Sequence, residues 1–278
     1  MANIPDNGEM QLPLNDGHTI SQLGLGVYKI ADADAARVVE TAIDAGYRLV
    51  DTAALYGNER GVGNGIRASG IPREDVFVTT KLWDDDHGYE ATLRAFDASL
   101  DRLGFDYVDL YLIHWPVPSR DLYVETWRAI ETLAADGRAR SIGVSNFAIP
   151  HLERLLAETG TVPAINQVEL HPWLPQNGLR AFNASHGILT EAWSPLARGR
   201  MIGVPGLDAI AAKHGKSPAQ VVIRWHLQVG NVVIPKSVTT ERITENINVF
   251  DFDLDADDLA VIDSLETGVR TGMNPDDH

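Results

Sequence analysis

The chain has 278 residues, of which 44% are apolar, and this length suits one eight-stranded α/β barrel, which needs about 250 residues. Its 39 Asp and Glu outnumber its 23 Lys and Arg, giving a formal net charge of -16, so the average surface repels nucleic-acid phosphates and anionic membranes. The absence of cysteine excludes disulfides, iron–sulfur clusters and thiolate zinc sites. We therefore expect neither nucleic acid nor a membrane as a partner, and no metal.

The first 17 residues, MANIPDNGEMQLPLNDG, lack the cationic start and the apolar stretch of a signal peptide. No uncharged run in the chain approaches the roughly 20 apolar residues that span a bilayer. The expected location is the cytoplasm.

Eight short apolar runs, most without polar alternation, indicate parallel strands that are buried on both faces. They cover residues 23–27, 48–50, 76–80, 108–113, 141–144, 164–168, 188–190 and 232–234. Helical patterns lie between them, as in Leu93, Phe96, Leu100 and Leu103, whose spacing places them on one face. Alternating strands and helices predict a parallel sheet, and eight units close it into a barrel.

Glycines mark the ends of the expected helices. Seven of them stand just past a helical stretch and shortly before the next strand, as left-handed C-terminal caps require. They are Gly46, Gly70, Gly104, Gly137, Gly160, Gly187 and Gly230. At the other end of a helix, Ser217 and Pro218 form an N-cap with proline in the first helical position.

The predicted fold is a single (β/α)8 TIM barrel domain over residues 1–278, with an N-terminal β-hairpin around residues 15–17 that closes one end of the barrel. The longest connection, residues 193–216, is a candidate substrate loop. Only a short C-terminal extension, about a dozen residues, follows Leu265. Trp127 and Trp225 lie in the middle of helices and are expected in the core.

Polar side chains close the strands or stand directly after them, at the barrel end where chemistry is located in this fold. They are Asp51, Lys81, His114, Ser145, Asn146, Gln167, Glu191, Trp193 and Lys236. Taken singly, Asp51 could cap a helix, Lys81 could extend to solvent, and His114 could be a core histidine. Together they would bury several charges around one point without structural need, which favours a catalytic site.

Tyr56 follows Asp51 in the same loop and is a candidate proton donor. Its phenol titrates near pH 10, and the ammonium of Lys81 would favour the phenolate and lower that pKa. The buried Lys81 needs a compensating carboxylate, for which Asp51 is the nearest strand-end residue. An uncharged His114 would hold a carbonyl oxygen beside the Tyr56 hydroxyl.

The chain resembles the aldo-keto reductases, and the resemblance runs from about Leu12 to Pro275. The segments DTAALYGNE, TTKLW, DLYLIHWP, SIGVSNF, INQVELHP, EAWSPLARG and IPKSVTTERITEN appear in family order. The catalytic tetrad of that family maps onto Asp51, Tyr56, Lys81 and His114. The segments KLWDDDHGYEATLRAF and VFDFDL are most similar to the bacterial 2,5-diketo-gluconate reductase branch.

The resemblance implies NADPH as cofactor, bound without the G-x-G-x-x-G motif, which is absent here; the GVGNG at residues 61–65 has the wrong spacing. Ser145, Asn146 and Gln167 would hold the nicotinamide carboxamide, with Trp193 stacked on the ring. Other cofactor-binding positions implied by the family are Ser194, Leu196, Lys236, Ser237, Val238, Arg242, Glu245 and Asn246. Two cations and a hydroxyl beside a helix N-terminus suit the adenosine 2′-phosphate.

For the substrate, Tyr28, Trp83 and Trp115 would form an apolar wall around His114. The short loop after His114 and the short C-terminal extension favour an open site. The chain is therefore expected to reduce aldehyde or ketone carbonyls of small polar substrates, such as 2,5-diketo-gluconate-like sugar acids and methylglyoxal, with Tyr56 as general acid. Relatives of the branch imply a monomer.

Three other classes of protein could account for parts of this pattern. A short-chain dehydrogenase is not supported, because the chain has no Tyr-x-x-x-Lys motif. A metal-dependent barrel hydrolase is not supported either, because the nine histidines form no H-x-H or H-E-x-x-H pair. The alternative that stays open is a nucleotide-binding regulatory subunit with little turnover, similar to potassium-channel β-subunits. That class would show a large partner surface or extra terminal segments.

Overall fold

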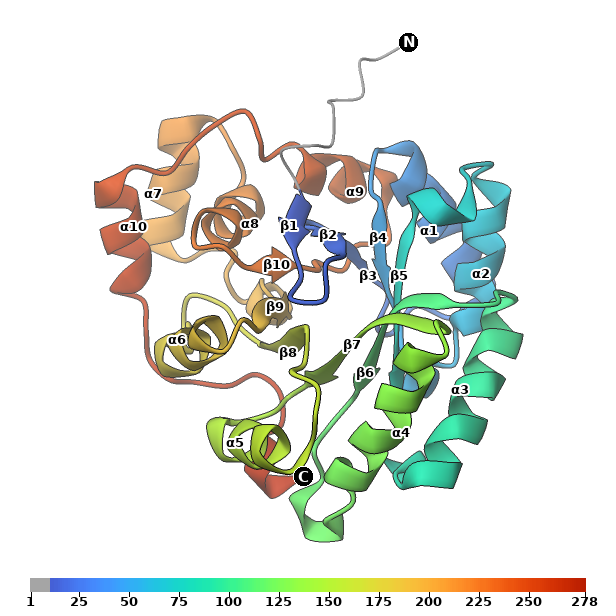
Figure 1. Ribbon diagram of the computed structural model, residues 1–278. Helices are drawn as coiled ribbons and strands as arrows, with labels where there is room; N and C mark the ends of the chain where they lie inside the picture. Colours follow the sequence, from blue (N-terminus) through green and yellow to red (C-terminus); the bar gives the residue numbers. More distant parts are fainter. Residues whose placement is uncertain (1–10) are drawn as a thin grey trace.

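The structure is a computed structural model that describes residues 11–278 (Figure 1). Eight parallel strands, each paired with the next along the chain, form one sheet. They are β3 (Leu25–Gly26), β4 (Leu49–Asp51), β5 (Phe77–Leu82), β6 (Val108–Ile113), β7 (Ala139–Ser145), β8 (Ile165–Glu169), β9 (Leu189–Trp193) and β10 (Val232–Val233). The two edges of the sheet meet at a parallel bridge between Leu23 and Val233. The predicted α/β barrel is confirmed, and each predicted run overlaps one strand.

Helices follow the strands and cover the outside of the barrel (Figure 1). They are α1 (Asp32–Asp44), α2 (Glu59–Ala68), α3 (Tyr89–Leu103), α4 (Tyr123–Ala135), α5 (Ile149–Glu158), α6 (Asn177–Ser185), α7 (Pro205–His214), α8 (Pro218–Gln228), α9 (Thr240–Ile247) and α10 (Ala256–Asp263). Short 3-10 turns are η2 (Ala54–Tyr56), η3 (Arg73–Asp75), η4 (Asp84–Asp86), η5 (Pro118–Arg120), η6 (Ala197–Gly199) and η7 (Pro275–Asp277).

The helices pack on the sheet through the apolar faces that the sequence predicts. In α3, Phe96, Leu100 and Leu103 are buried and Leu93 is half-buried. Trp127 of α4 and Trp225 of α8 are among the largest fully buried side chains. Burial of these faces is the main force that holds the helices against the barrel.

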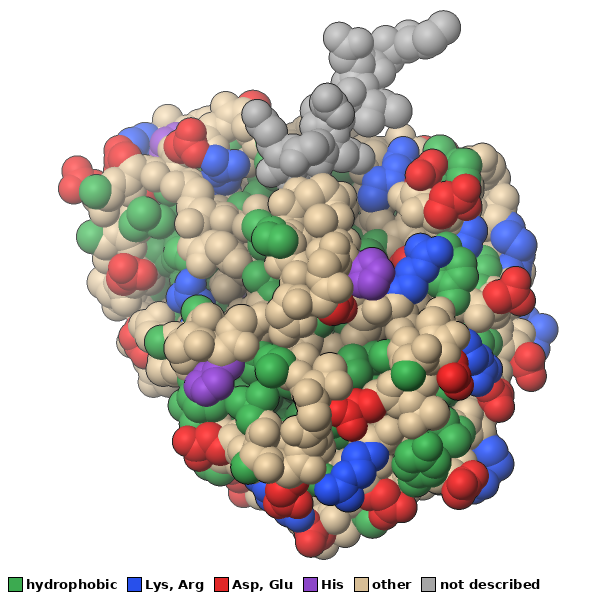
Figure 2. Space-filling view, viewed as in Figure 1, with side chains coloured by type: hydrophobic (Ala, Val, Ile, Leu, Met, Phe, Trp, Pro, Cys, Tyr) green, Lys and Arg blue, Asp and Glu red, His purple; other side chains and the backbone are tan. Residues whose placement is uncertain are grey.

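The predicted hairpin closes the amino end of the barrel. Strands β1 (Gln11–Pro13) and β2 (Thr19–Ser21) pair antiparallel, and Ile20 is fully buried against Leu49 and Ile165, which begin two barrel strands. Figure 2 shows this face, where charged side chains gather over the helices around the hairpin. Because this end is filled, a ligand must enter from the carboxyl ends of the strands.

Six of the seven predicted glycine caps adopt the left-handed conformation, and Gly160 does not. The helix α5 instead ends at Thr159, whose backbone is extended and whose hydroxyl donates to the Leu155 carbonyl at 2.6 Å. A left-handed residue is therefore not needed there. The predicted N-cap is present: the Ser217 hydroxyl accepts from the Gln220 amide at 3.3 Å.

The glycines of the GVGNG segment are packing residues of α2. A methyl group at Gly61 would lie 2.3 Å from the Asp32 carbonyl oxygen of α1. One at Gly63 would lie 1.9 Å from the Leu103 carbonyl oxygen at the end of α3. Glycine at these positions lets the backbones of α1, α2 and α3 approach closely. This packing accounts for the glycines of the segment, so nucleotide binding is not needed to explain them.

Gly63→Ala is expected to lower the free energy of unfolding by about 3 kcal/mol, because the added methyl group must displace backbone atoms. Gly178→Ala is a matched control, since Gly178 also lies in a helix but has no atom within 4 Å of the added methyl group. It should be neutral or raise stability by about 0.5 kcal/mol. Urea unfolding measures the free energy of unfolding of both variants. An equal change in Gly63→Ala and Gly178→Ala would contradict the packing role of Gly63.

The sequence suggested one long loop over residues 193–216, but only part of this connection is a loop. Residues 205–214 form α7, whose Leu207, Ile210 and Ala211 are buried in the core. Only the first part of this connection borders the cavity described below. Within residues 11–278, no helix combines the length and apolar character needed to cross a bilayer.

Candidate active site

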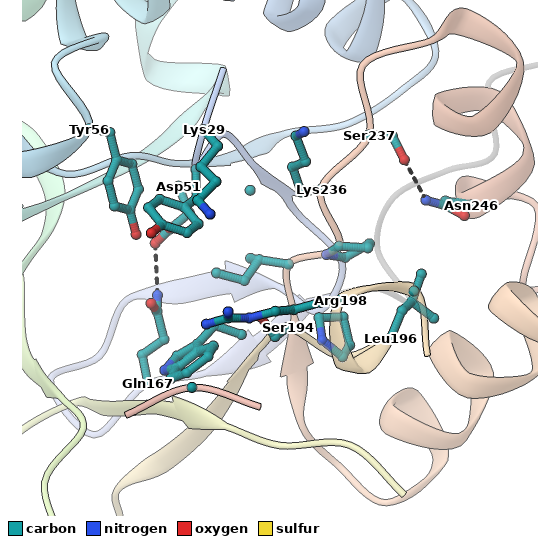
Figure 3. A pocket seen from close by; sticks show the side chains of 18 of the residues that line it. Lys29, Asp51, Tyr56, Gln167, Ser194, Leu196, Arg198, Lys236, Ser237 and Asn246 are labelled. Atoms are coloured by element: carbon teal, nitrogen blue, oxygen red, sulfur yellow. Dashed lines mark hydrogen bonds between the residues drawn. The ribbon is translucent and has the colours of Figure 1, made fainter. Parts of the chain in front are cut away.

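A cavity of about 780 Å³ opens at the carboxyl ends of the barrel strands (Figure 3). Of the side chains predicted at the strand ends and in the binding sites, Lys81 and Glu191 do not line it, and both are fully buried. The predicted residues on its wall are Tyr28, Asp51, Tyr56, Trp83, His114, Trp115, Ser145, Asn146, Gln167, Trp193, Ser194, Leu196, Lys236, Ser237, Val238, Arg242, Glu245 and Asn246. The strand ends thus bring these residues to one place.

A buried ion pair lies between β4 and β5. The Lys81 Nζ donates to Asp51 Oδ1 at 2.6 Å and to the Thr52 carbonyl oxygen at 2.9 Å. Asp51 pairs in register with Thr79, so Lys81, two residues further on, projects from the same face of the sheet. The same ammonium lies 5.2 Å from the ring centroid of Tyr56.

The predicted lowering of the Tyr56 pKa is wrong. Burial raises the pKa of Tyr56 to about 12, and Lys81 only partly opposes this rise, which the charge of Asp51 reinforces. The phenol therefore keeps its proton at neutral pH. What Lys81 provides is attraction to the phenolate once a proton has left, which suits a proton donor rather than a resting anion.

His114, at the end of β6, is held uncharged. Burial drives the pKa of His114 well below its usual range, and the positive charge of Lys81 adds to this effect. Within residues 11–278 its Nδ1 has no hydrogen-bond partner. The ring stands edge-on to Tyr56, with centroids 5.7 Å apart, and to Trp83, at 5.4 Å.

Neutral polar groups from β7, β8 and β9 form the wall beside the ion pair. Asn146 Nδ2 donates to the His114 carbonyl oxygen at 2.9 Å, and Trp193 Nε1 donates to Asn146 Oδ1 at 2.9 Å. Ser145 Oγ donates to the Gln167 carbonyl oxygen at 2.9 Å, and Gln167 Nε2 donates to Asp51 Oδ2 at 2.7 Å. These bonds fix every amide and indole of the wall in one orientation.

The other end of the cavity can bind an anion. Lys236 and Arg242 line it, and neither forms an ion pair within residues 11–278. The buried Ser237 accepts from Asn246 Nδ2 at 3.0 Å, which leaves its own hydroxyl proton for a ligand. Unpaired cations in a chain with a net charge of -16 indicate an anionic ligand.

Two cations on the cavity wall were missed from the sequence. Lys29 follows β3 in a left-handed conformation (φ 58°), and Arg198 lies in η6. Figure 3 places both, with Lys236, between the Asp51–Gln167 bond at one end and the Ser237–Asn246 bond at the other. Lys29 stands at a strand end and could have been found by that rule, whereas Arg198 lies in a connection with no such signal.

The C-terminal segment also borders the cavity and forms part of its wall. Gly272, Met273 and His278 line it, as do Leu55 and Ile202, all of which were missed. The Glu169 carboxylate anchors the segment by accepting from the amides of Thr271 and Gly272 at 2.6 and 3.0 Å. His278 then stacks on Trp115, with ring centroids 4.6 Å apart.

His278 also contacts the Asp84 carboxyl at 2.5 Å. These long-range contacts place the segment over the substrate end. Within the described part of the chain, no group of three or more His, Asp and Glu side chains is arranged to hold a metal ion.

Comparison with known proteins identifies the family. The model of the Aldo/keto reductase family matches residues 20–267. A glyoxal reductase of Bacillus subtilis is 50% identical, with 99% of each chain covered. The methylglyoxal reductase DkgA of Escherichia coli is 50% identical over 95% of this chain and 96% of that protein. A crystal structure of the Gox0644 D53A mutant in complex with NADPH is 49% identical, with a TM-score of 0.92 and coverage of 96% and 97%.

The chain belongs to the aldo/keto reductase family, as its motifs predict. These relatives lie in the branch similar to the 2,5-diketo-gluconate reductases, which confirms the branch as well.

Proposed function

We propose that the protein reduces aldehyde and ketone carbonyls of small polar substrates with NADPH. The chain is an NADP-dependent oxidoreductase of its family, and NADPH is its cofactor. The observation that carries the proposal is one continuous cavity, which joins a protonated phenol beside a buried ammonium to a cluster of cations that form no ion pair within residues 11–278.

The cavity fits NADPH by charge and by shape. Lys236, Ser237 and Arg242 suit the adenosine 2′-phosphate, since they offer two cations and a hydroxyl. Lys29 and Arg198, which lie between the two ends, suit the diphosphate (Figure 3). The opposite end has the neutral polar wall of Ser145, Asn146, Gln167 and Trp193, which suits an uncharged carboxamide and ring. The family positions Ser194, Leu196, Val238, Glu245 and Asn246 complete the cofactor wall.

NADPH, when bound, supplies the hydride for the carbonyl carbon. Tyr56 donates its proton to the carbonyl oxygen, and the Lys81 ammonium stabilises the phenolate that remains. Asp51 compensates the charge of Lys81 inside the barrel. His114, being neutral, donates a hydrogen bond to the same oxygen and orients it toward Tyr56 without competing as an acid.

Small dicarbonyl compounds and sugar acids are the proposed substrates. Tyr28, Trp83 and Trp115 form an apolar wall that excludes water, and the C-terminal segment limits the size of the site. The glyoxal and methylglyoxal reductases support small dicarbonyls by their names.

A substrate panel tests this function. NADPH absorbance is followed with glyoxal, methylglyoxal, 2,5-diketo-gluconate and an aromatic aldehyde, and a higher kcat/KM is expected for the small polar compounds. Preference for the aromatic aldehyde would contradict the proposed substrate class. Tight NADPH binding without turnover on any carbonyl would instead support a regulatory subunit.

The monomeric state and the cytoplasmic location remain predictions from the sequence. Light scattering of the eluted protein measures the first, and a single species near 30.4 kDa is expected. A species of twice that mass would contradict it.

A further inference from the structure

A second buried carboxyl group, Glu191, lies beside the ion pair of the proposed reductase site. Glu191 stands in β9, is fully buried, and is paired in register with Gln167 of β8. The Gln167 Nε2 donates one hydrogen to Asp51 Oδ2 at 2.7 Å and the other to Glu191 Oε2 at 2.8 Å. Lys81 donates to the other oxygen of Asp51 at 2.6 Å. One ammonium, one amide and two carboxyl groups therefore form a single chain of hydrogen bonds.

Gln167 can present only its carbonyl oxygen to a ligand in this arrangement. Both hydrogens of its amide are already donated to the two carboxyl groups, and its Oε1 is the polar atom that remains on the cavity wall. A flipped amide would set that oxygen against the Asp51 carboxylate, which is unfavourable. Asp51 and Glu191 thus determine which group of the cofactor carboxamide Gln167 can bind. The Gln167 oxygen can accept a hydrogen bond only from the carboxamide NH2 group.

The charges around Glu191 do not allow both carboxyl groups to be ionised. Asp51 and Lys81 are the charged groups that face Glu191 across the barrel interior. On the other side, β10 presents the apolar Val232 in register with it. The helix α6 packs outside β9, and its one charged side chain, Arg180, is engaged with the backbone beyond α8.

A single ammonium compensates a single carboxylate, so a second charge in this water-poor interior would be uncompensated. Asp51 is bonded directly to Lys81 and Glu191 is not, so the proton belongs on Glu191. Consistent with this, burial and the neighbouring charge of Asp51 raise the pKa of Glu191 to about 8. Within residues 11–278 its Oε1 has no partner, which leaves this oxygen to carry the proton.

We propose that Glu191 is a positioning residue that carries a proton at neutral pH and, with Asp51, holds the Gln167 amide in the orientation that binds the nicotinamide carboxamide. This rests on the proposed function, because only a nicotinamide cofactor gives that orientation a purpose. Loss of the proton above about pH 8 adds a negative charge beside Asp51, which makes Lys81 and Tyr56 hold their protons more tightly. Turnover in the reductive direction should fall there.

Infrared spectroscopy of the protein without cofactor or substrate tests the proton directly. The carbonyl stretch of a protonated carboxylic acid is expected at pH 7, should fade as the pH rises through about 8, and should be absent from Glu191→Gln. Glu59→Gln is the control, since Glu59 is also buried but forms an ion pair with Arg102, and it should leave the band unchanged. A band that persists in Glu191→Gln, or that is absent from the unaltered protein, overturns the assignment.

Cofactor titration tests the positioning role. Glu191→Leu removes the acceptor for Gln167 and is expected to weaken NADPH binding about tenfold, the equivalent of one buried hydrogen bond. Glu191→Gln restores an acceptor and should recover most of the affinity, while moving the alkaline fall in kcat to higher pH. Equal NADPH affinity in the Leu and Gln variants would overturn the role. If the proposed reductase function is wrong, the protein shows no turnover of any carbonyl compound but keeps the infrared band of protonated Glu191.

Discussion

Tyr56→Phe is expected to lower kcat for carbonyl reduction by about 100- to 10,000-fold, the usual loss when a general acid is removed. The substitution deletes only the hydroxyl, so the ring stays packed against Tyr28, with centroids 5.0 Å apart. The affinity for NADPH should therefore be unchanged, because the phenol does not contact the proposed phosphate sites.

Steady-state kinetics and a fluorescence titration with NADPH measure the two quantities separately. Tyr89→Phe is the matched control, since this hydroxyl bonds Thr132 on the outer helices and does not line the cavity. Unchanged turnover in Tyr56→Phe would refute the proton donor, and an equal loss in both variants would point to a general effect on stability.

Arg242→Ala is expected to raise the KM for NADPH by about 10- to 100-fold, which corresponds to losing charge-assisted hydrogen bonds to one phosphate. The KM for NADH should change far less, because NADH lacks the 2′-phosphate. The structural reason is that Arg242 has no ion-pair partner within residues 11–278 and lies on the cavity wall near Lys236 and Ser237.

The ratio of the two KM values, measured for the same carbonyl substrate, decides this prediction. Arg37→Ala is the control, because Arg37 is an exposed cation of α1 away from the cavity. Equal effects of Arg242→Ala on NADPH and NADH would mean that the 2′-phosphate is bound elsewhere.

The barrel could be predicted from the sequence because its strands are buried on both faces. Residues 108–113, for example, are all buried and, apart from Asp109, apolar or aromatic, and the sheet order then follows from short connections between parallel neighbours. The ends of elements were less predictable. Gly160 resembled the other caps, yet the hydroxyl of Thr159 satisfies the helix end one residue earlier.

The site could be predicted where residues follow strands directly, since parallel strands end at the same rim. That rule places Asp51, Lys81, His114 and Gln167 together, and the structure brings them around one cavity. It could not place His278, which reaches the cavity only because Glu169 anchors the segment before it. Contacts between distant segments leave no local pattern in the sequence.

The pKa values could not be predicted, because they depend on how completely each group is buried. Lys81 beside Tyr56 suggests an acidic phenol, but loss of hydration outweighs that charge and raises the pKa of Tyr56 to about 12. Glu191 likewise lies near the end of a strand, as its neighbours in the site do, and its raised pKa depends on burial and on the interior charge of Asp51.

A crystal structure of the protein with NADP+ and a substrate alcohol would show whether Tyr56 reaches the oxygen that it is proposed to protonate. We expect the nicotinamide beside Gln167 and Trp193, the substrate oxygen within hydrogen-bond distance of both Tyr56 and His114, and the 2′-phosphate at Arg242. A dinucleotide bound with its nicotinamide away from Tyr56, or a substrate oxygen out of reach of that hydroxyl, would contradict this proposal.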